Sequence, residues 1–252
     1  MFRYALILVF AATAAAFAQD RIEVDIDTAQ KPWNHLEVNN NPDQFQFAIV
    51  TDRTGGHRPG VFEDGVRKLN LLQPEFVMSV GDLIEGYTED PEQIDREWTE
   101  FIGFIEQLEM PFFYVPGNHD LSNEVMVEEW KKRFGKLWYH FVYKDVLFLC
   151  LDSEDPPDTQ MSETQAAYVQ TVLARHPDVR WTLVFLHKPM WNRGQDSQGW
   201  QKIEQSLQGR PYTMFAGHTH DYYKQVRHDA QYITLATNGR RQRITRAELR
   251  RV

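Results

Sequence analysis

Residues 111–120 of the chain read PFFYVPGNHD, an apolar run that leads directly into a polar turn. The apolar run predicts a buried β-strand, and Gly117 allows the backbone to turn sharply where that strand ends. Asn118, His119 and Asp120 follow the turn at once. In open α/β sheets the carboxyl ends of the strands border the crevice in which ligands bind. The stretch therefore predicts an α/β fold with a functional site at a strand end.

The same pattern, an apolar run followed by a polar turn, recurs at four other places in the chain. It gives Asp52 after FAIVT, Gly81 and Asp82 after FVMSV, His187 after LVFL, and Gly217, His218 and His220 after TMFA. A lone histidine or a single Gly-Asp pair after a strand is most often an ordinary turn. Five such strand ends in one chain favour a single site to which all of them contribute.

Apolar residues at helical spacing separate these predicted strands, and Ser162 with Gln165 three residues later predicts a capping box. Repeated β-α units followed by hairpins predict an α/β (α+β) protein whose mixed sheets are covered by helices, without an interdomain linker. The predicted helices cover 59–73, 91–108, 123–134, 162–176 and 199–209, and the predicted hairpins cover 139–152 and 222–235.

Length and charge limit the classes of function. The chain has 252 residues, enough for one substantial domain with a large core. Its net charge is −9, and no basic stripe runs through the body of the sequence. Proteins that bind nucleic acid through the phosphate backbone carry such a stripe, so we do not expect binding to a nucleic-acid scaffold.

The two ends of the sequence differ from its body. Residues 1–18 have a basic start at Arg3, an apolar run and a small-x-small pattern, which is typical of a signal peptide and predicts a secreted or periplasmic protein. An uncleaved anchor is the alternative, although the run is short for a span, which needs roughly 20 apolar residues. After cleavage we expect no stable membrane insertion. Residues 19–43 are predicted to be an irregular lead-in, and 237–252 an Arg-rich tail that is either a basic surface helix or a shortened end.

Cys150, the single cysteine, lies in the apolar run VLFLCLD. No intrachain disulfide is therefore possible. A buried thiol on a strand is the expected role, with metal ligation as the less favoured alternative because apolar residues flank it on both sides.

The side chains at the predicted strand ends are imidazoles, carboxylates and one amide, without a thiolate. This donor set suits zinc, manganese or iron. Two such metals, about 3.5–4 Å apart, can activate water and stabilise the entering and leaving oxygens of an in-line displacement. Hydrolysis of a phosphate ester is the reaction that most needs such a clamp.

The order Asp52, GDLIEG, GNHD, His187, GHTH resembles the calcineurin-like metallophosphoesterases over residues 44–236. The resemblance implies a four-layer αββα sandwich of two mixed β-sheets flanked by helices. It also implies two divalent transition-metal ions (Mn, Fe or Zn) and hydrolysis of a phosphomonoester or phosphodiester by metal-activated hydroxide. A non-catalytic or one-metal relative that binds a phosphorylated ligand is the alternative.

The resemblance assigns a role to each candidate residue. Asp82 bridges the two metals, and His119 donates a proton to the leaving oxygen or stabilises its charge, with Asp120 orienting the imidazole. Such general acid catalysis contributes typically about 10²–10⁴-fold. The remaining ligands are Asn118, His187 and His218 for one metal and Asp52 and His220 for the other.

The sequence departs from this family at the first strand, where Asp-x-His is replaced by Asp52-Arg53-Thr54. One imidazole is thus missing from the Asp52/His220 metal. Three outcomes are open: Thr54 leaves the position to water or binds weakly through its hydroxyl, His57 reaches it across two glycines, or the metal is absent. Arg53 either contacts a substrate phosphate or is a solvated surface residue.

Four aromatic residues lie close to the histidine motifs in the sequence, namely Trp191, Trp200, Tyr222 and Tyr223. They form either an aromatic wall for an organic group of the substrate or, for most of them, part of the core. The predicted partner is a phosphate ester, and the sequence identifies neither that ester nor the oligomeric state.

Overall fold

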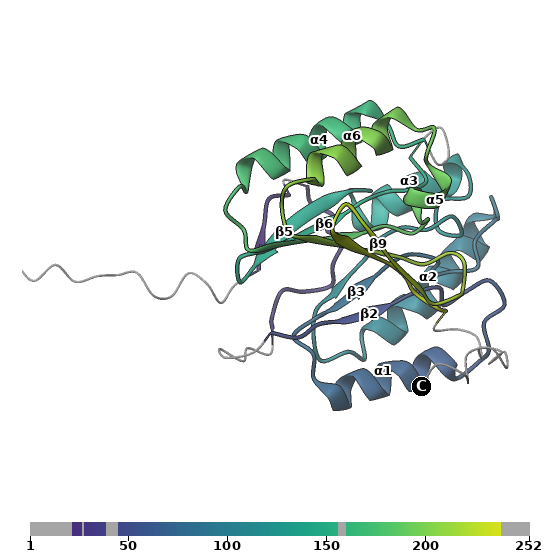
Figure 1. Ribbon diagram of the computed structural model, residues 1–252. Helices are drawn as coiled ribbons and strands as arrows, with labels where there is room; N and C mark the ends of the chain where they lie inside the picture. The colour runs from purple at the N-terminus through teal and green to yellow at the C-terminus, as the bar shows by residue number, and fades with distance from the viewer. Residues whose placement is uncertain (1–21, 27, 39–44, 156–159, 238–252) are drawn as a thin grey trace, which may run out of the picture.

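The computed structural model of the protein describes residues 22–26, 28–38, 45–155 and 160–237, and Figure 1 shows its ribbon. The predicted signal peptide and residues 238–252 of the Arg-rich tail lie outside these ranges. Within them, no helix combines the length and the apolar character that crossing a membrane requires.

Two β-sheets lie face to face in the middle of the molecule, with helices on both outer sides (Figure 1). The larger sheet has the order β1-β5-β6-β7-β8-β10-β9 and mixes parallel with antiparallel pairs. The smaller sheet has the order β2-β3-β4, and these three strands are all parallel. The strands are β1 Glu23–Val24, β2 Ala48–Val50, β3 Val77–Ser79, β4 Phe112–Phe113, β5 Tyr139–Tyr143, β6 Val146–Cys150, β7 Trp181–Phe185, β8 Tyr212–Ala216, β9 Tyr223–Arg227 and β10 Ala230–Thr234.

Helices cover the outer face of each sheet. In Figure 1, α4 and α6 lie above the larger sheet, and α1 and α2 lie below the smaller one. The helices are α1 Val61–Leu72, α2 Pro91–Ile105, α3 Glu124–Phe134, α4 Glu163–Arg175, α5 Met190–Arg193 and α6 Gln198–Leu207. The five predicted helices are confirmed with slightly shorter bounds, whereas the short α5 was not predicted.

Three hydrophobic cores fill the three spaces between these four layers. The core between the sheets is rich in phenylalanine, with Phe141 stacked on Phe113 at 4.2 Å and on Phe148 at 4.6 Å between ring centroids. Cys150 is fully buried in this core, and burial raises the pKa of its thiol far above the ordinary value. The expected buried thiol is thus confirmed, and the four-layer αββα sandwich is present.

Local sequence signals explain where several elements begin and turn. Asp90 caps α2 by accepting a hydrogen bond from the backbone N–H of Glu92. The turn of the first predicted hairpin is formed by Lys144 and Asp145, with φ of 47° and 59°, as a two-residue turn between antiparallel strands requires. The second hairpin turns at His228 and Asp229 in the same way, with φ of 48° and 61°.

The predicted capping box of α4 is only half present. Ser162 accepts from the backbone N–H of Gln165, but the Gln165 side chain does not return to Ser162. It accepts from the backbone N–H of Asp152 at 2.8 Å and donates to the Asp152 carbonyl at 2.9 Å. Gln165 therefore fixes the loop that follows β6, on the side of the molecule where the candidate ligands lie.

The lead-in is more ordered than the sequence predicted. Within it, β1 pairs with β5, and Trp33 forms a bridge with Phe113 and packs against Tyr139. The expectation of an irregular lead-in was wrong for these residues, because their apolar side chains complete the core between the sheets.

Glycines bring the strand ends together. A Cβ at Gly117 would overlap the Asp82 side chain, and a Cβ at Gly217 would overlap the Asp52 carboxylate. Backbone hydrogen bonds join the same turns, from Asp52 N–H to the Gly81 carbonyl at 3.1 Å and from Gly217 N–H to the His187 carbonyl at 2.9 Å. Both sheets therefore deliver their strand ends to one place.

Candidate metal centre

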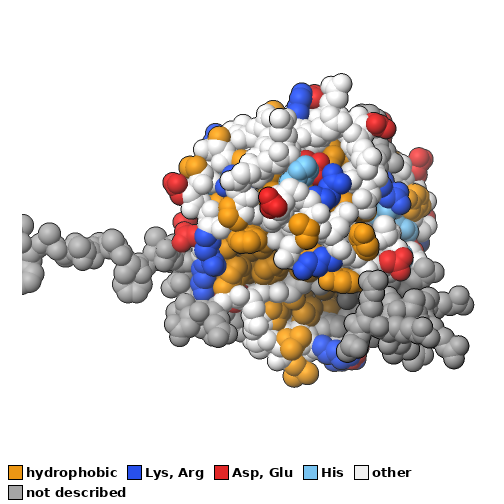
Figure 2. All heavy atoms as spheres, viewed as in Figure 1, with side chains coloured by type: hydrophobic (Ala, Val, Ile, Leu, Met, Phe, Trp, Pro, Cys, Tyr) orange, Lys and Arg blue, Asp and Glu red, His pale blue; other side chains and the backbone are white. Residues whose placement is uncertain are grey.

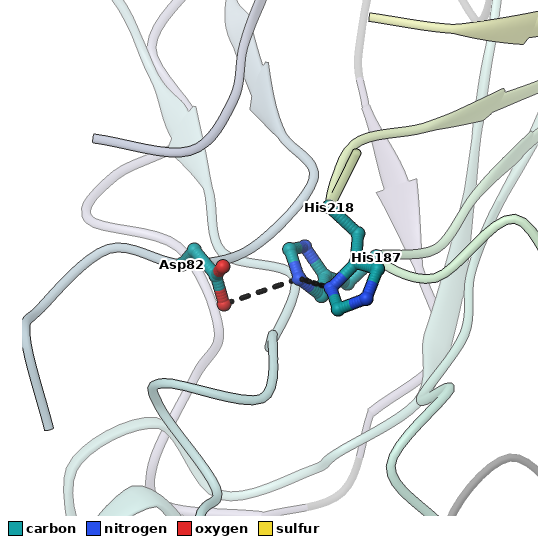
Figure 3. Close-up of side chains that lie close together, drawn as sticks. All are labelled: Asp82, His187 and His218. Atoms are coloured by element: carbon teal, nitrogen blue, oxygen red, sulfur yellow. Dashed lines mark hydrogen bonds and ion pairs between the residues drawn. The ribbon is translucent and has the colours of Figure 1, made fainter. Parts of the chain in front are cut away.

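Four side chains from different strand ends converge on one point. The Nε2 atom of His187 lies 3.1 Å from Asp82 Oδ1, 3.0 Å from Asn118 Oδ1 and 3.1 Å from His218 Nδ1. Figure 3 shows Asp82, His187 and His218 directed toward one another. These distances match a ligand shell, because donors about 2.1 Å from one cation and at right angles to each other lie about 3.0 Å apart.

The chemistry of these atoms also fits a cation. The Nδ1 atom of His187 lies 2.8 Å from the Val80 carbonyl, which requires an N–H at that nitrogen. In the neutral ring Nε2 then carries a lone pair, and it faces the oxygen lone pairs of Asp82 and Asn118. Such a group of acceptors is stable only around a positive charge. A histidine fixed by a backbone carbonyl at its other nitrogen is also the usual arrangement of a metal ligand.

In the metal-free protein a proton supplies this positive charge. Burial lowers the pKa of His187, but the Asp82 carboxylate outweighs burial and raises it to about 10. Burial raises the pKa of Asp82, but His187 and His119 outweigh burial and lower it to about 2. Burial, followed by the charge on His187, lowers the pKa of His218 to about 4. A metal ion would replace the proton that the pair shares.

A second group of possible ligands, Asp52, Asp82 and His220, shares Asp82 with the first. Nε2 of His220 lies 3.3 Å from Asp52 Oδ1, the same oxygen that accepts from the His218 backbone N–H at 2.9 Å. Asp52, Asp82, His218 and His220 all have positive φ, between 40° and 70°. This conformation is uncommon outside glycine, and its repetition at four candidate ligands is typical of a functional site.

Thr54 contributes no imidazole to this second group. Its side chain is fully buried, and its hydroxyl donates to the Asp82 carbonyl at 3.2 Å, as does its backbone N–H. Thr54 therefore ties the first strand end to the second, and its hydroxyl hydrogen is directed to the protein backbone.

His57 does not take the place of the missing imidazole. Its Nδ1 atom lies 2.5 Å from Glu85 Oε1. Gly55, which lies between Thr54 and His57, packs so closely that a Cβ there would sit 3.0 Å from the His220 ring. Among the described residues, the second group thus has two carboxylates and one imidazole.

Arg53 neither faces the site nor is solvated, so both expectations for it were wrong. It is 4% exposed, forms an ion pair with Glu100 of α2 and donates to the Leu83 carbonyl at 3.2 Å. Its guanidinium also lies 5.1 Å from the ring centre of Phe104. The side chain turns toward α2 because that helix offers a carboxylate and aromatic rings, so Arg53 fixes the loop rather than a substrate.

A histidine at position 54 should restore the missing ligand. We expect Thr54→His to tighten binding of the second metal at least about tenfold, or ~1.4 kcal/mol, because a nitrogen donor replaces a hydroxyl. Titration of the metal-free protein with Mn²⁺ in a calorimeter measures this affinity. Thr54→Ser, which keeps the hydroxyl, is the matched control. An unchanged second affinity in Thr54→His would mean that water or another group already occupies the position.

His119 lies beside the ligands but belongs to neither group. Its Nδ1 atom lies 2.6 Å from the Glu85 carbonyl, so Nδ1 carries the hydrogen and Nε2 points toward the site, 4.0 Å from Asp82 Oδ2. The side chain is 19% exposed, which leaves it accessible to a substrate.

Asp120 does not orient His119, contrary to expectation. Its carboxylate accepts from the backbone N–H groups of Leu83, Ile84 and Gly117 at 2.9–3.2 Å. Burial, followed by the Asp82 charge, raises its pKa to about 7. Asp120 therefore joins the turn after β3 to the turn after β4, while the Glu85 carbonyl holds the His119 ring.

The sequence did not predict two sets of side-chain contacts near the candidate ligands. Tyr87 accepts a hydrogen bond from Asn118 Nδ2 at 2.8 Å, and its ring meets His119 edge-on at 4.9 Å between centroids. Lys188, next to His187, forms a buried ion pair with Glu154 at 2.6 Å. Tyr87, the last residue of GDLIEGY, could not be assigned a role from the sequence, because it reaches the GNHD turn only through the backbone conformation of residues 86 and 87.

The four aromatic residues near the histidine motifs divide into two pairs. Trp191 and Trp200 are buried in the core between the larger sheet and its helices, as expected for most of them. Tyr222 and Tyr223 are exposed. On the face seen in Figure 2, Lys and Arg side chains are scattered among acidic and apolar ones rather than gathered in one band.

Comparison with known proteins agrees with this geometry. The model of the calcineurin-like phosphoesterase family matches residues 45–222. The 3′,5′-cyclic adenosine monophosphate phosphodiesterase CpdA of Haemophilus influenzae is 23% identical over 163 residues, which cover 63% of this chain and 57% of that protein. The match thus spans little more than half of that relative.

Solved structures show the same fold at low identity. A dimetal phosphatase of Danio rerio is 15% identical, with a TM-score of 0.59 over 77% of this chain and 88% of that one. GAP50 of Plasmodium, described as the anchor in the inner membrane complex, is also 15% identical, with a TM-score of 0.58 over 79% of this chain and 73% of that one. One fold thus carries differently described roles, so the site must support the function.

Proposed function

The chain belongs to the calcineurin-like phosphoesterase family, and on this premise we propose that it hydrolyses a phosphomonoester or phosphodiester with two divalent metals. The observation that carries the proposal is the convergence of four donor atoms, three of which lie 3.0–3.1 Å from the fourth, His187 Nε2. Asp82, Asn118, His187 and His218 would hold one metal, and Asp52, Asp82 and His220 the other. Bound there, the metals would polarise a water molecule and offset charge on the phosphoryl oxygens.

The chain's own residues would do the remaining work. His119 would donate the proton at Nε2 to the leaving oxygen, because its Nδ1 hydrogen is directed to the Glu85 carbonyl. The backbone N–H of His119 donates to Asp82 Oδ1 at 3.0 Å, which fixes the carboxylate and the imidazole relative to each other. Asp120 would keep both turns in register without taking part in proton transfer.

A one-metal or binding protein is the second candidate, and the first strand end is the observation that favours it. Thr54 and His57 add no nitrogen donor to the second group, because Thr54 bonds to the Asp82 carbonyl and His57 to Glu85. We infer that the Asp52/His220 metal binds more weakly than the other one. At low metal concentration the protein would then hold a single ion.

Elemental analysis and a hydrolysis assay test these candidates together. We expect the purified protein to carry transition metal and, with added Mn²⁺, to hydrolyse p-nitrophenyl phosphate, bis(p-nitrophenyl) phosphate or cyclic AMP, the last chosen because CpdA is described as acting on it. Turnover that rises with Mn²⁺ supports the enzyme. Metal binding without turnover of any ester favours the one-metal or binding protein, and absence of metal binding contradicts the enzyme and favours a binding protein.

A further inference from the structure

We propose that Tyr87 is a positioning residue of this site, which aims the Asn118 amide at the metal and holds the ring of His119. This inference rests on the proposed function. Tyr87 has φ of 51°, and the preceding Gly86 has φ of 59°. Two successive left-handed residues curl the chain after Asp82 back over the GNHD turn, a costly conformation for a tyrosine.

Three contacts hold Tyr87 in this place. Its backbone N–H donates to Ser122 Oγ at 3.0 Å, its hydroxyl accepts from Asn118 Nδ2 at 2.8 Å, and its ring stands at 90° to the ring of His119. A Cβ at Gly86 would overlap the His119 carbonyl, so only glycine allows this close approach. Tyr87 is nevertheless 63% exposed, so burial of apolar surface does not explain its position.

The hydroxyl of Tyr87 binds the end of the Asn118 amide that faces away from the other candidate ligands. Among the described residues, it is the partner of Asn118 Nδ2, while Asn118 Oδ1 lies 3.0 Å from His187 Nε2. With Nδ2 bound to the hydroxyl, the oxygen is left as the atom that can ligate a cation. Groups that orient a metal ligand in this way typically change metal affinity about 10–100-fold when they are removed.

The ring of Tyr87 acts on a different residue. The Glu85 carbonyl holds the His119 ring at Nδ1. The ring of Tyr87, 4.9 Å away between centroids and at 90° to the imidazole, packs against it and so restricts its rotation about the Cβ–Cγ bond. The two halves of the side chain thus have separable effects, the hydroxyl on metal affinity and the ring on proton donation.

Two substitutions separate these effects. We expect Tyr87→Phe to weaken Mn²⁺ binding to the metal-free protein about tenfold or more by calorimetry, while kcat at saturating Mn²⁺ stays within about twofold of wild type. Tyr87→Leu should weaken binding equally and also lower kcat, more for phenyl phosphate than for p-nitrophenyl phosphate, because the poorer leaving group depends more on His119. Tyr168→Phe, which removes a hydroxyl bonded to His140 Nδ1 at 2.6 Å, is the control and should change neither quantity.

Each result decides one part of the inference. Mn²⁺ affinity of Tyr87→Phe within about twofold of wild type would overturn the role of the hydroxyl, and equal kcat in Tyr87→Leu and Tyr87→Phe would overturn the role of the ring. If wild type binds Mn²⁺ but hydrolyses no ester, the proposed function fails while calorimetry still decides the role of the hydroxyl. If wild type binds no Mn²⁺, both are wrong.

Discussion

Replacement of His119 by alanine should lower kcat about 10²–10⁴-fold while leaving bound metal unchanged. The imidazole stands outside both ligand groups, so its removal takes no donor from the metals. Its Nε2 atom faces the site, 4.0 Å from Asp82 Oδ2, and its Nδ1 atom is held by the Glu85 backbone carbonyl. Among the described histidines that are not candidate ligands, no other combines these two features. The loss should be larger for phenyl phosphate than for p-nitrophenyl phosphate, whose leaving group needs less protonation.

Steady-state kinetics at saturating Mn²⁺, together with elemental analysis, measure this effect. His228→Asn is a suitable control, because His228 occupies the β9-β10 turn with φ of 48°, a conformation that asparagine tolerates. Equal losses for both esters in His119→Ala would assign the imidazole to charge stabilisation or substrate binding. Unchanged kcat with full metal content would contradict a role for His119 in catalysis.

The sequence predicted which strand ends come together better than it predicted the contacts that support them. Asp52, Asp82 and His187 each follow an apolar run, and the carboxyl ends of neighbouring strands must meet once those runs form sheets. Apolar periodicity, which is also a local pattern, predicted most elements and mixed sheets covered by helices, whereas the four-layer sandwich was implied by the resemblance to the family. The two small deviations, β1 in the lead-in and the short α5, involve too few residues for a period to be visible.

Side-chain direction could not be predicted in the same way. Arg53 points to α2 because Glu100 and Phe104 lie there, and Asp120 turns to backbone N–H groups of the β3 turn. Tyr87 reaches Asn118 only because two residues in a row are left-handed. Each of these depends on contacts between segments about 30–50 residues apart in the chain, which spacing in one sequence does not encode.

Substitution of Asp82 by asparagine should abolish most of the metal binding and hydrolysis together. Among the described residues, Asp82 is the carboxylate shared by both ligand groups. Asparagine keeps the oxygen that accepts from the His119 backbone N–H but removes the charge opposite His187. We expect bound metal to fall from two equivalents to at most one, and hydrolysis to fall on the order of 10³-fold, the scale on which one preorganised group acts in a water-excluded site.

Unfolding of the metal-free protein tests the charge of Asp82 independently of metal binding. The raised pKa of His187, about 10 against an ordinary 6.5, means that its ion pair with Asp82 stabilises the fold fully below pH 6.5 and is lost as the pH rises toward 10. The stability that the lowered pKa of Asp82 contributes is lost only as the pH falls from 3.8 toward 2. The lowered pKa of His218 reduces stability only as the pH falls below 6.5. Neither group therefore changes the free energy of unfolding between pH 6.5 and 10. With chelator present, the free energy of unfolding of wild type should therefore fall between pH 6.5 and 10, and Asp82→Asn should show much less of this slope.

Asp64→Asn is the matched control, because Asp64 is a half-exposed carboxylate on α1 whose ion pairs, within the described part of the chain, are with Arg67 and Lys68 of the same helix. It should leave metal binding, hydrolysis and the slope above pH 6.5 as in wild type, since pairs of this kind contribute little. Two equivalents of metal bound by Asp82→Asn with wild-type affinity would show that Asp82 is not the shared ligand. An unchanged slope would show that another carboxylate balances His187, and Asp52, whose charge also raises the pKa of His187, would then be the residue to replace.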